Sequence, residues 1–225
     1  MGGGGFSMEP ENLLLDRFVL SLAPRDRPKV CFVPTASGDA ESYVDRFYAS
    51  FGELPCTPSH LSLFKLPSAD LRSFVREQDV IYVGGGNTRS MLALWREWQL
   101  DRIFREAWEE GMVLAGISAG SICWFEQGTT DSIPGDLTVL RCLGFLDGSN
   151  CPHYDGEPAR RPSYRRMVAE GTIGAGYATD DGVALHYVGT ELRQMVSSRP
   201  HALAYRLERV NGTAEETPLT PRFLG

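Results

Sequence analysis

The amino-acid sequence predicts an α/β fold: a three-layer sandwich with a mostly parallel central sheet, of the flavodoxin-like kind. In the first half of the chain, short apolar runs alternate with segments whose apolar residues recur at helical spacing. Glycine-rich turns follow two of these runs, at 84–86 and 116–120. Alternating strands and helices indicate a doubly wound parallel sheet, which binds ligands outside the carboxyl ends of its strands.

Each expected element is read from hydrophobic spacing and turn residues. Apolar residues at helical spacing begin near Leu13, and the run at 29–33 is a buried strand closed by a turn at Pro34. The rest of the first half is expected to contain helices over 40–51, 70–77, 88–98 and 100–110, and strands over 60–66, 80–83 and 112–115. The second half is less regular, with a loop over 129–136, a helix over 158–170, and strands over 173–179, 183–188 and 205–210.

Length and composition favour one domain over residues 1–225. The chain is 42% hydrophobic, enough for one full core. A formal net charge of −7 without a basic run argues against nucleic-acid binding. Five scattered cysteines without a Cys-x-x-Cys pair disfavour a disulfide scaffold or zinc site and indicate the reducing cytoplasm. No apolar stretch approaches the ~20 residues that span a bilayer, and the N-terminus lacks the pattern of a signal peptide.

Four glycines open the chain at Gly2–Gly5, directly before Phe6. One interpretation of this run is a flexible tail. The other is a strand-to-helix loop whose preceding strand lies outside this sequence. Glycine is compatible with both, because it adopts backbone conformations that other residues avoid.

The strongest functional motif lies at the end of an apolar run, in Gly116-Ile117-Ser118-Ala119-Gly120, and a helix-like segment follows it. This Gly-x-Ser-x-Gly pattern predicts a nucleophile elbow, in which small neighbours let a strand turn sharply into a helix. Ser118 would then lie at a helix N-terminus, where backbone N–H groups can hold an oxyanion. The alternative is a glycine-rich turn whose serine has no catalytic role.

A serine nucleophile needs a base, and an acid that orients the base. His153 is favoured as the base because it follows Pro152 after an apolar segment, where a strand end would place it at the catalytic edge. The other histidines are His60, His186 and His201, and His186 alternates with apolar neighbours as a packed strand residue does. The candidate acids are Asp180 and Asp181, in a turn before Gly182, and the loop residues Asp131, Asp136 and Asp155.

An oxyanion hole needs two backbone N–H donors. Ala119, directly after the serine, supplies one, and the Gly84-Gly85-Gly86 loop can supply the other. The same loop could instead cap a strand and begin a helix. Nucleotide binding is disfavoured, because the loop has neither a P-loop lysine nor a Gly-x-Gly-x-x-Gly pattern.

Arginines follow the favoured histidine at positions 160, 161, 165 and 166. They form either a solvated helix face or a clamp for a substrate carboxylate, which arginine binds bidentately.

Taken in order, Gly84-Gly85-Gly86-Asn87-Thr88, Gly116–Gly120 and Pro152-His153 resemble peptidase E, the aspartyl dipeptidases of serine peptidase family S51. The opening Gly2–Phe6 and Val33–Ser37 are also similar to that family, and the similarity extends to about residue 190. The fold of the family is similar to class I glutamine amidotransferases, which carry cysteine at the elbow. Its relatives include cyanophycinases.

The resemblance implies Ser118 as the nucleophile, His153 as the base and Asp181 as the acid, where family members have glutamate. A second assignment of the acid would fall on Asp131. The expected oxyanion hole consists of Gly85, Gly86 and Ala119, and the residues expected to bind substrate are Asn87 and Arg161.

The expected function is a cytoplasmic serine peptidase that hydrolyses short peptides, with dipeptides carrying N-terminal Asp preferred, through an acyl-enzyme intermediate. Alternatives are a broader or cyanophycinase-like peptidase, an esterase-type acyl hydrolase, and a noncatalytic binding module of the same fold. An α/β-hydrolase esterase places its acid before its histidine, an order that fits only if Asp131 is the acid. The expected partner is a short peptide substrate, not nucleic acid or membrane, with a homodimer as a candidate assembly. No metal or organic cofactor is expected.

Overall fold

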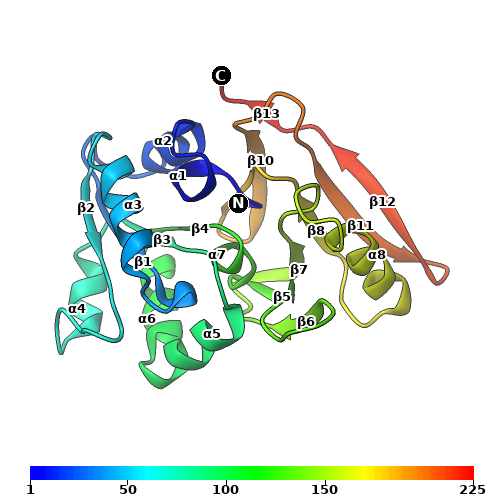
Figure 1. Ribbon diagram of the computed structural model, residues 1–225, viewed down its shortest axis with the longest axis horizontal. Coiled ribbons are helices and arrows are strands. Elements are labelled where there is room, and N and C mark those ends of the chain that lie inside the picture. The colour runs from blue at the N-terminus through cyan, green and yellow to red at the C-terminus, as the bar shows by residue number, and fades with distance from the viewer. The chain divides into compact units, whose positions relative to one another are not determined.

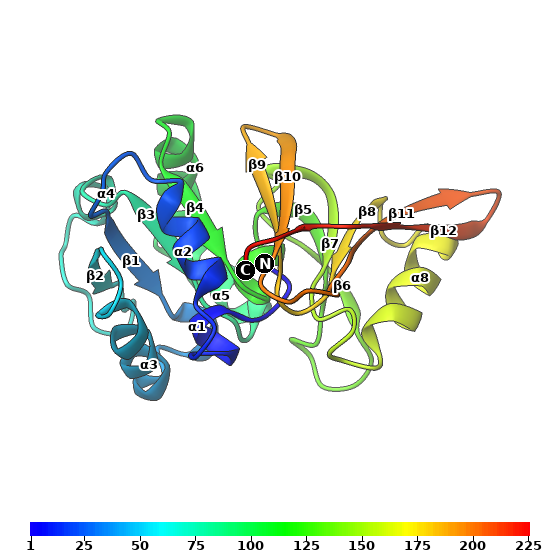
Figure 2. The ribbon, with the colours of Figure 1, turned by 90° about the horizontal axis from the view of Figure 1, so that it is seen from above.

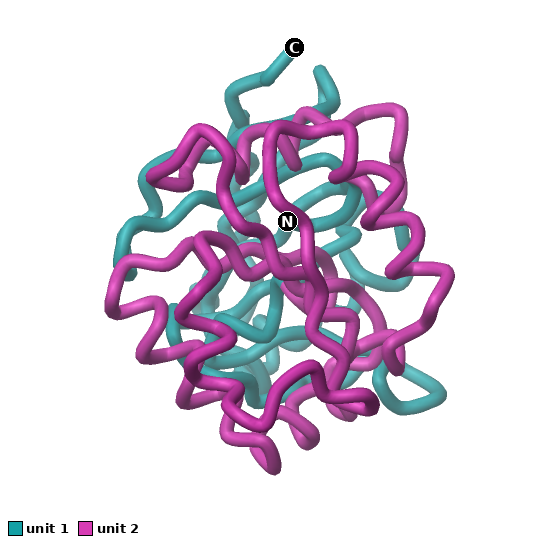
Figure 3. Tube along the Cα trace, turned by 90° about the vertical axis from the view of Figure 1, so that its left-hand side faces the viewer, with its two compact units in different colours: residues 1–4, 121–225 teal, residues 5–120 magenta.

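The chain divides into two compact units (Figure 3), and each unit has its own β-structure. The computed structural model describes residues 1–225. One unit is Gly5–Gly120, and the other combines Met1–Gly4 with Ser121–Gly225. The predicted α/β class with a parallel central sheet is confirmed, whereas a single domain over 1–225 stays a prediction.

In the unit Gly5–Gly120, four parallel strands are ordered β2-β1-β3-β4. They are β1 (Lys29–Val33), β2 (Thr57–His60), β3 (Val80–Val83) and β4 (Val113–Gly116). The helices are α1 (Gly5–Met8), α2 (Leu14–Ser21), α3 (Glu41–Phe51), α4 (Leu71–Arg76), α5 (Thr88–Glu97) and α6 (Leu100–Glu109), with the 3-10 helix η1 (Thr35–Ser37). Figure 1 shows α1 and α2 on one side of the strands and α4, α5 and α6 on the other. Helices on both faces explain why β3 is apolar throughout and fully buried.

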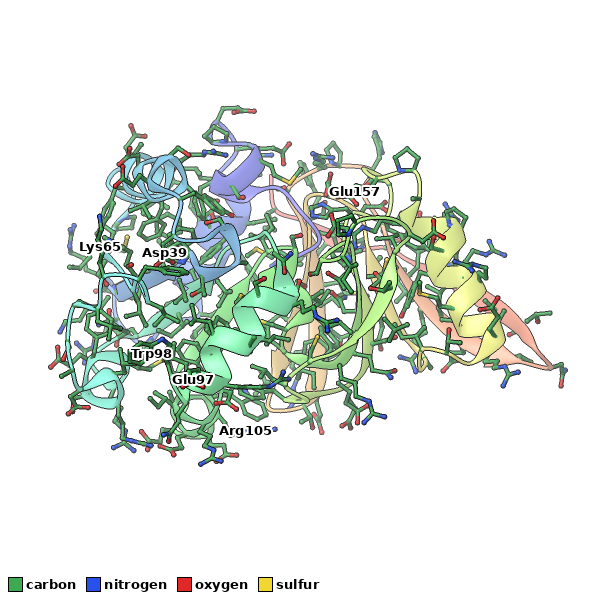
Figure 4. The ribbon with its side chains drawn as sticks, turned by 60° about the horizontal axis from the view of Figure 1, so that its bottom comes forward. Asp39, Lys65, Glu97, Trp98, Arg105 and Glu157 are labelled. Atoms are coloured by element: carbon green, nitrogen blue, oxygen red, sulfur yellow. The ribbon has the colours of Figure 1, made fainter.

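The strand expected over 60–66 is wrong, since β2 ends at His60. The apolar residues Leu61 and Leu63 suggested a strand, but they are buried within the loop that follows β2. Asp39 holds this loop (Figure 4), because its carboxylate accepts hydrogen bonds from Ser62 Oγ at 2.6 Å and from the Leu63 N–H at 2.9 Å.

Asp16, on α2, is fully buried beneath the start of α1. Its carboxylate accepts hydrogen bonds from the Phe6 N–H at 2.9 Å and from the Tyr82 hydroxyl at 3.1 Å. Burial outweighs these bonds and raises the pKa of the Asp16 carboxyl from 3.8 to about 6. The folded state therefore binds the proton more tightly than the unfolded state.

We expect the free energy of unfolding to fall as pH rises from 3.8 to about 6, because the unfolded chain releases the Asp16 proton first. The variant Asp16→Asn keeps an oxygen for the Phe6 N–H but does not titrate, so it should lose up to about 3 kcal/mol of this dependence. Urea unfolding of both proteins at several pH values measures the effect. An unchanged pH slope in the variant would exclude Asp16 as its source.

The other unit contains a six-stranded sheet of order β12-β11-β8-β7-β5-β6. Its parallel neighbours are β5 (Phe125–Thr130), β7 (Leu146–Cys151) and β8 (Gly176–Thr179). Its antiparallel strands are β6 (Thr138–Arg141), β11 (Ala204–Val210) and β12 (Thr213–Leu219). Helix α8 (Arg160–Glu170) contributes Tyr164 and Val168 to a buried cluster that includes Tyr205 and Leu207 of β11.

A separate three-stranded sheet consists of β9 (Val183–Val188), β10 (Glu191–Ser197) and β13 (Arg222–Phe223). Figure 2 shows β9 and β10 as a projecting hairpin. The strand predicted over 183–188 is confirmed, but β10 and β12 were not expected, and β5 occupies the start of the loop predicted over 129–136. None of the helices combines the length and the apolar character needed to cross a bilayer.

The opening glycines do not form a flexible tail. Gly2, Gly3 and Gly4 are buried, and Met1–Gly4 groups with Ser121–Gly225. The Gly2 N–H donates to the Val183 carbonyl at 2.9 Å. This segment is therefore an ordered part of its unit.

Candidate active site

Ser118 lies in the sharp turn between β4, which ends at Gly116, and α7 (Ala119–Ile122). Its φ of 55° is left-handed, a strained conformation for a residue with a Cβ. The turn closes because its glycines lack side chains: a Cβ at Gly116 would lie 2.2 Å from the Gly120 carbonyl oxygen, and one at Gly120 would lie 2.2 Å from that of Val83. The local geometry is that of the predicted elbow, with Ser118 half-buried.

The Gly84–Gly86 loop lies directly beside this serine. A Cβ placed on Gly85 would be 3.3 Å from Ser118 Cβ and 3.8 Å from Ser118 Oγ. Gly86 has a φ of 135°, and a Cβ there would lie 2.3 Å from the Ala36 carbonyl oxygen. The structure thus brings together two motifs that are more than thirty residues apart in the sequence.

The Gly85 N–H already has an acceptor, because it donates to the Tyr43 hydroxyl at 3.2 Å. This contact gives the Gly85 amide a partner within the protein, and its role as an oxyanion donor stays a prediction. The loop also offers the N–H of Gly86, an exposed residue. Ala119 is the first residue of α7, where backbone N–H groups have no acceptor within the helix. Asn87, expected to bind substrate, caps α5 by accepting a hydrogen bond from the Ser90 N–H at 2.9 Å.

Tyr43, on α3, connects this loop to α1. Its hydroxyl lies 2.5 Å from Ser7 Oγ, so it can donate to Ser7 while accepting from Gly85. Burial raises the pKa of Tyr43, which keeps the hydroxyl protonated at neutral pH. The ring also packs 3.0 Å from the position that a Cβ on Gly84 would take.

We expect Tyr43→Phe to lower kcat about tenfold, because the Gly85 amide would lose its acceptor and the loop beside Ser118 would lose its alignment. The matched control is Tyr48→Phe, on the same helix, which removes only a hydroxyl bonded to His60 Nδ1 at 2.9 Å. Steady-state kinetics with both variants makes the comparison. Equal kcat values for the two would show that the Tyr43 contact does not align the loop.

His153 and Asp181 form a buried pair in the other unit. His153 Nδ1 lies 2.7 Å from Asp181 Oδ1, and the two side chains are 10% and 7% exposed. His153 follows the end of β7 with a left-handed φ of 56°. Asp181 lies in the turn between β8 and β9, where its N–H donates to Asp155 Oδ1 at 2.8 Å. Such a pair can fix the tautomer and orientation of an imidazole.

The competing acids lie elsewhere. Asp131 has a 66% exposed side chain, and its oxygen is 3.8 Å from Arg160 Nη2. Asp180 accepts a hydrogen bond from the Leu203 N–H at 2.9 Å, and burial raises the pKa of its carboxyl to about 6. Neither carboxylate is hydrogen-bonded to His153, whose Nδ1 is taken by Asp181.

Arg161, expected to read a substrate carboxylate, is bound within its own unit. It forms an ion pair with Glu216 of β12, whose side chain is only 7% exposed. Its guanidinium also lies over the ring of Tyr205, 4.9 Å from the centroid. Tyr154 donates its hydroxyl to the same glutamate at 2.5 Å. These contacts hold α8 against the sheet. Because Arg161 is already paired with Glu216, they do not favour its binding a substrate carboxylate.

Arg160 is the arginine that sequence reasoning did not separate from its neighbours. Its side chain is 3% exposed and donates to the Thr129 carbonyl at 3.0 Å and to Glu157 at 2.6 Å. Glu157 (Figure 4) lies on the loop that leads from His153 to α8. Nothing in the local sequence distinguishes this buried arginine from the exposed Arg161.

Comparison with known proteins identifies the family of the chain. The model of peptidase family S51 matches residues 1–195. The uncharacterized peptidase YgaJ of Bacillus subtilis strain 168 is 59% identical over 225 residues, which cover 100% of this chain and 97% of that protein. Peptidase E of Shewanella amazonensis is 38% identical over 88 residues, 38% of this chain and 37% of that protein.

Two solved structures show the same fold. A peptidase from an acI-B1 Actinobacterium superposes with a TM-score of 0.71 at 21% identity, covering 98% of this chain and 92% of that one. The putative peptidase E protein of Listeria monocytogenes EGD-e gives a TM-score of 0.54 at 18% identity, covering 91% of this chain and 93% of that one. With the family match over most of its length, the chain belongs to peptidase family S51.

Proposed function

We propose that the chain is a serine peptidase that hydrolyses short peptides, with Ser118 as its nucleophile. The observation that carries this proposal is the left-handed Ser118 in a strand-to-helix turn, directly beside the Gly84–Gly86 loop. A strained serine at such a turn is typical of activated nucleophiles. The hydrogen bond between His153 and Asp181 supports their roles as base and acid.

In the proposed mechanism, Ser118 Oγ attacks the peptide carbonyl carbon while His153 Nε2 takes the serine proton. Asp181 keeps the Nδ1 proton in place and stabilises the imidazolium. The N–H groups of Ala119 and Gly86 stabilise the oxyanion of the tetrahedral intermediate. His153 then protonates the leaving amine, which leaves an acyl-enzyme on Ser118. Water, deprotonated by His153, hydrolyses that ester and restores the hydroxyl.

The proposed substrate class is dipeptides with an N-terminal aspartate. Its support is the likeness to peptidase E and the family match. The engagement of Arg161 by the buried Glu216 favours a second candidate, a peptidase of broader specificity, because it removes the expected reader of the aspartate side chain.

Hydrolysis of a small panel tests both candidates. The panel consists of dipeptides and aminoacyl p-nitroanilides that begin with Asp, Glu, Asn, Ala, Leu or Arg, with Ser118→Ala as the control. Cleavage confined to Asp substrates and lost in the variant supports the aspartyl dipeptidase. Ser118-dependent cleavage of other residues supports the broader peptidase. Cleavage that persists in the variant would exclude the proposed nucleophile.

A further inference from the structure

The glycine run at the N-terminus lies against the pair of His153 and Asp181. Two backbone hydrogen bonds hold it there: the Gly2 N–H donates to the Val183 carbonyl at 2.9 Å, and the Gly182 N–H donates to the Gly3 carbonyl at 3.0 Å. These bonds fix the segment Met1–Gly4 on the turn that carries Asp181. The proposed mechanism gives this segment no role.

Gly3 leaves room for the Asp181 carboxylate. A Cβ on Gly3 would lie 1.9 Å from Asp181 Oδ1 and 3.0 Å from His153 Nδ1. Gly156 leaves room for the other oxygen of this carboxylate, because a Cβ on Gly156 would lie 2.3 Å from Asp181 Oδ2. Neither glycine has a positive φ, so each backbone conformation suits alanine and only the space requires glycine.

Hydrogen bonds alone restrain this carboxylate little. Its one hydrogen bond is accepted by Oδ1 from the Nδ1–H of His153. The neighbouring Asp155 and Asp180 are also carboxylates: Asp155 accepts the Asp181 N–H, and Asp180 is bonded to Leu203. They can repel the Asp181 carboxylate, but they cannot donate to it. The two glycine backbones are the walls that restrict its position.

We propose that Gly3 and Gly156 are positioning residues, which form a slot that holds the Asp181 carboxylate on His153 Nδ1. The consequence for catalysis rests on the proposed function, whereas the slot itself does not. A methyl group at position 3 would meet the end of an aspartate side chain, which can rotate away. The carboxylate would then leave Nδ1, and the fold would persist.

The test begins with Gly3→Ala. We expect kcat to fall about a hundredfold with KM little changed, because the imidazole would lose its orientation. In proton NMR, the hydrogen-bonded Nδ1 proton of His153 should disappear from the downfield region. The matched control is Gly174→Ala in the same unit, where a Cβ would make an ordinary 3.4 Å contact with Gln127, and it should change neither readout.

A double-mutant cycle then identifies the partner of the added methyl group. In an Asp181→Ala background the obstructing carboxylate is absent and only the 3.0 Å contact with His153 Nδ1 remains, so Gly3→Ala should lower Tm and kcat much less than it does in the wild-type protein. If Gly3→Ala lowers Tm and kcat equally in both backgrounds, the proposal is overturned. A downfield Nδ1 proton signal of His153 that persists in Gly3→Ala would also overturn it. If Gly3→Ala does not fold, Gly156→Ala tests the opposite wall with the same expected results.

The NMR signal and the Tm coupling do not depend on activity. If the protein has no peptidase activity but shows both effects, the slot is supported and the proposed function is refuted. If its activity depends on Ser118 but the Gly3→Ala variant is fully active, the proposed function is supported and the slot is refuted.

Discussion

The variant Ser118→Ala is expected to lower kcat by roughly 10⁴- to 10⁶-fold, because no other group can form the acyl-enzyme. The change removes a single half-buried hydroxyl from a turn whose geometry depends on Gly116 and Gly120, so Tm should change little. Steady-state hydrolysis and thermal unfolding of the same preparations provide the two measurements.

The control is Ser90→Ala, which removes the hydroxyl of an exposed serine on α5. It should retain full activity. More than a tenth of the wild-type activity in Ser118→Ala would contradict the mechanism, and a large fall in Tm would show that the serine is structural.

The second large effect is expected from Asp181→Asn. An asparagine at this position can present an N–H₂ group to His153 Nδ1, which would favour the wrong tautomer of the imidazole. A loss of about 10⁴-fold in kcat is expected for such a change. Asp131→Asn should cost less than tenfold, because Asp131 is exposed and lies near Arg160.

Measuring both variants under one set of conditions ranks the two carboxylates directly. The reverse ranking would assign the acid to Asp131 and give the triad the order found in α/β-hydrolases. Similar small losses of kcat in Asp181→Asn and Asp131→Asn would indicate that His153 acts without an orienting acid.

Local pattern was sufficient for the elements nearest the site. The runs at 30–33 and 80–83 are buried on both faces, as strands of a covered parallel sheet are, and both are strands. The turn at Ser118 could also be predicted, because the small residues that it requires lie within five consecutive positions. The partner of His153 was not readable from local pattern, which left several aspartates open; the contact with Asp181 is the one that the family resemblance implied.

The features that were missed depend on residues far apart in the chain. Gly85 meets Tyr43 from 42 positions away, and Arg161 meets Glu216 from 55 positions away. No periodicity encodes such pairs, so the sequence could not show that the Gly85 amide and the Arg161 guanidinium each have a partner within the protein. The strand β12 was missed for a related reason: it is a largely exposed edge strand, whose polar residues give no apolar alternation.

The N-terminal glycines show the same limit. Composition alone left Gly2–Gly5 as either a flexible tail or a strand-to-helix loop, because both use glycine. Their role becomes visible only when Gly3 is seen against Asp181, 178 positions later. Close approach of backbone to a side chain is a requirement that composition and spacing do not reveal.

Covalent labelling tests the central claim, that Ser118 is an activated nucleophile, most directly. The native protein would be treated with a fluorophosphonate, digested and analysed by mass spectrometry. The account predicts one adduct, on the peptide that contains Ser118, formed in the wild-type protein and absent from Ser118→Ala. An adduct on another residue, or none in a protein that hydrolyses peptides, would contradict it.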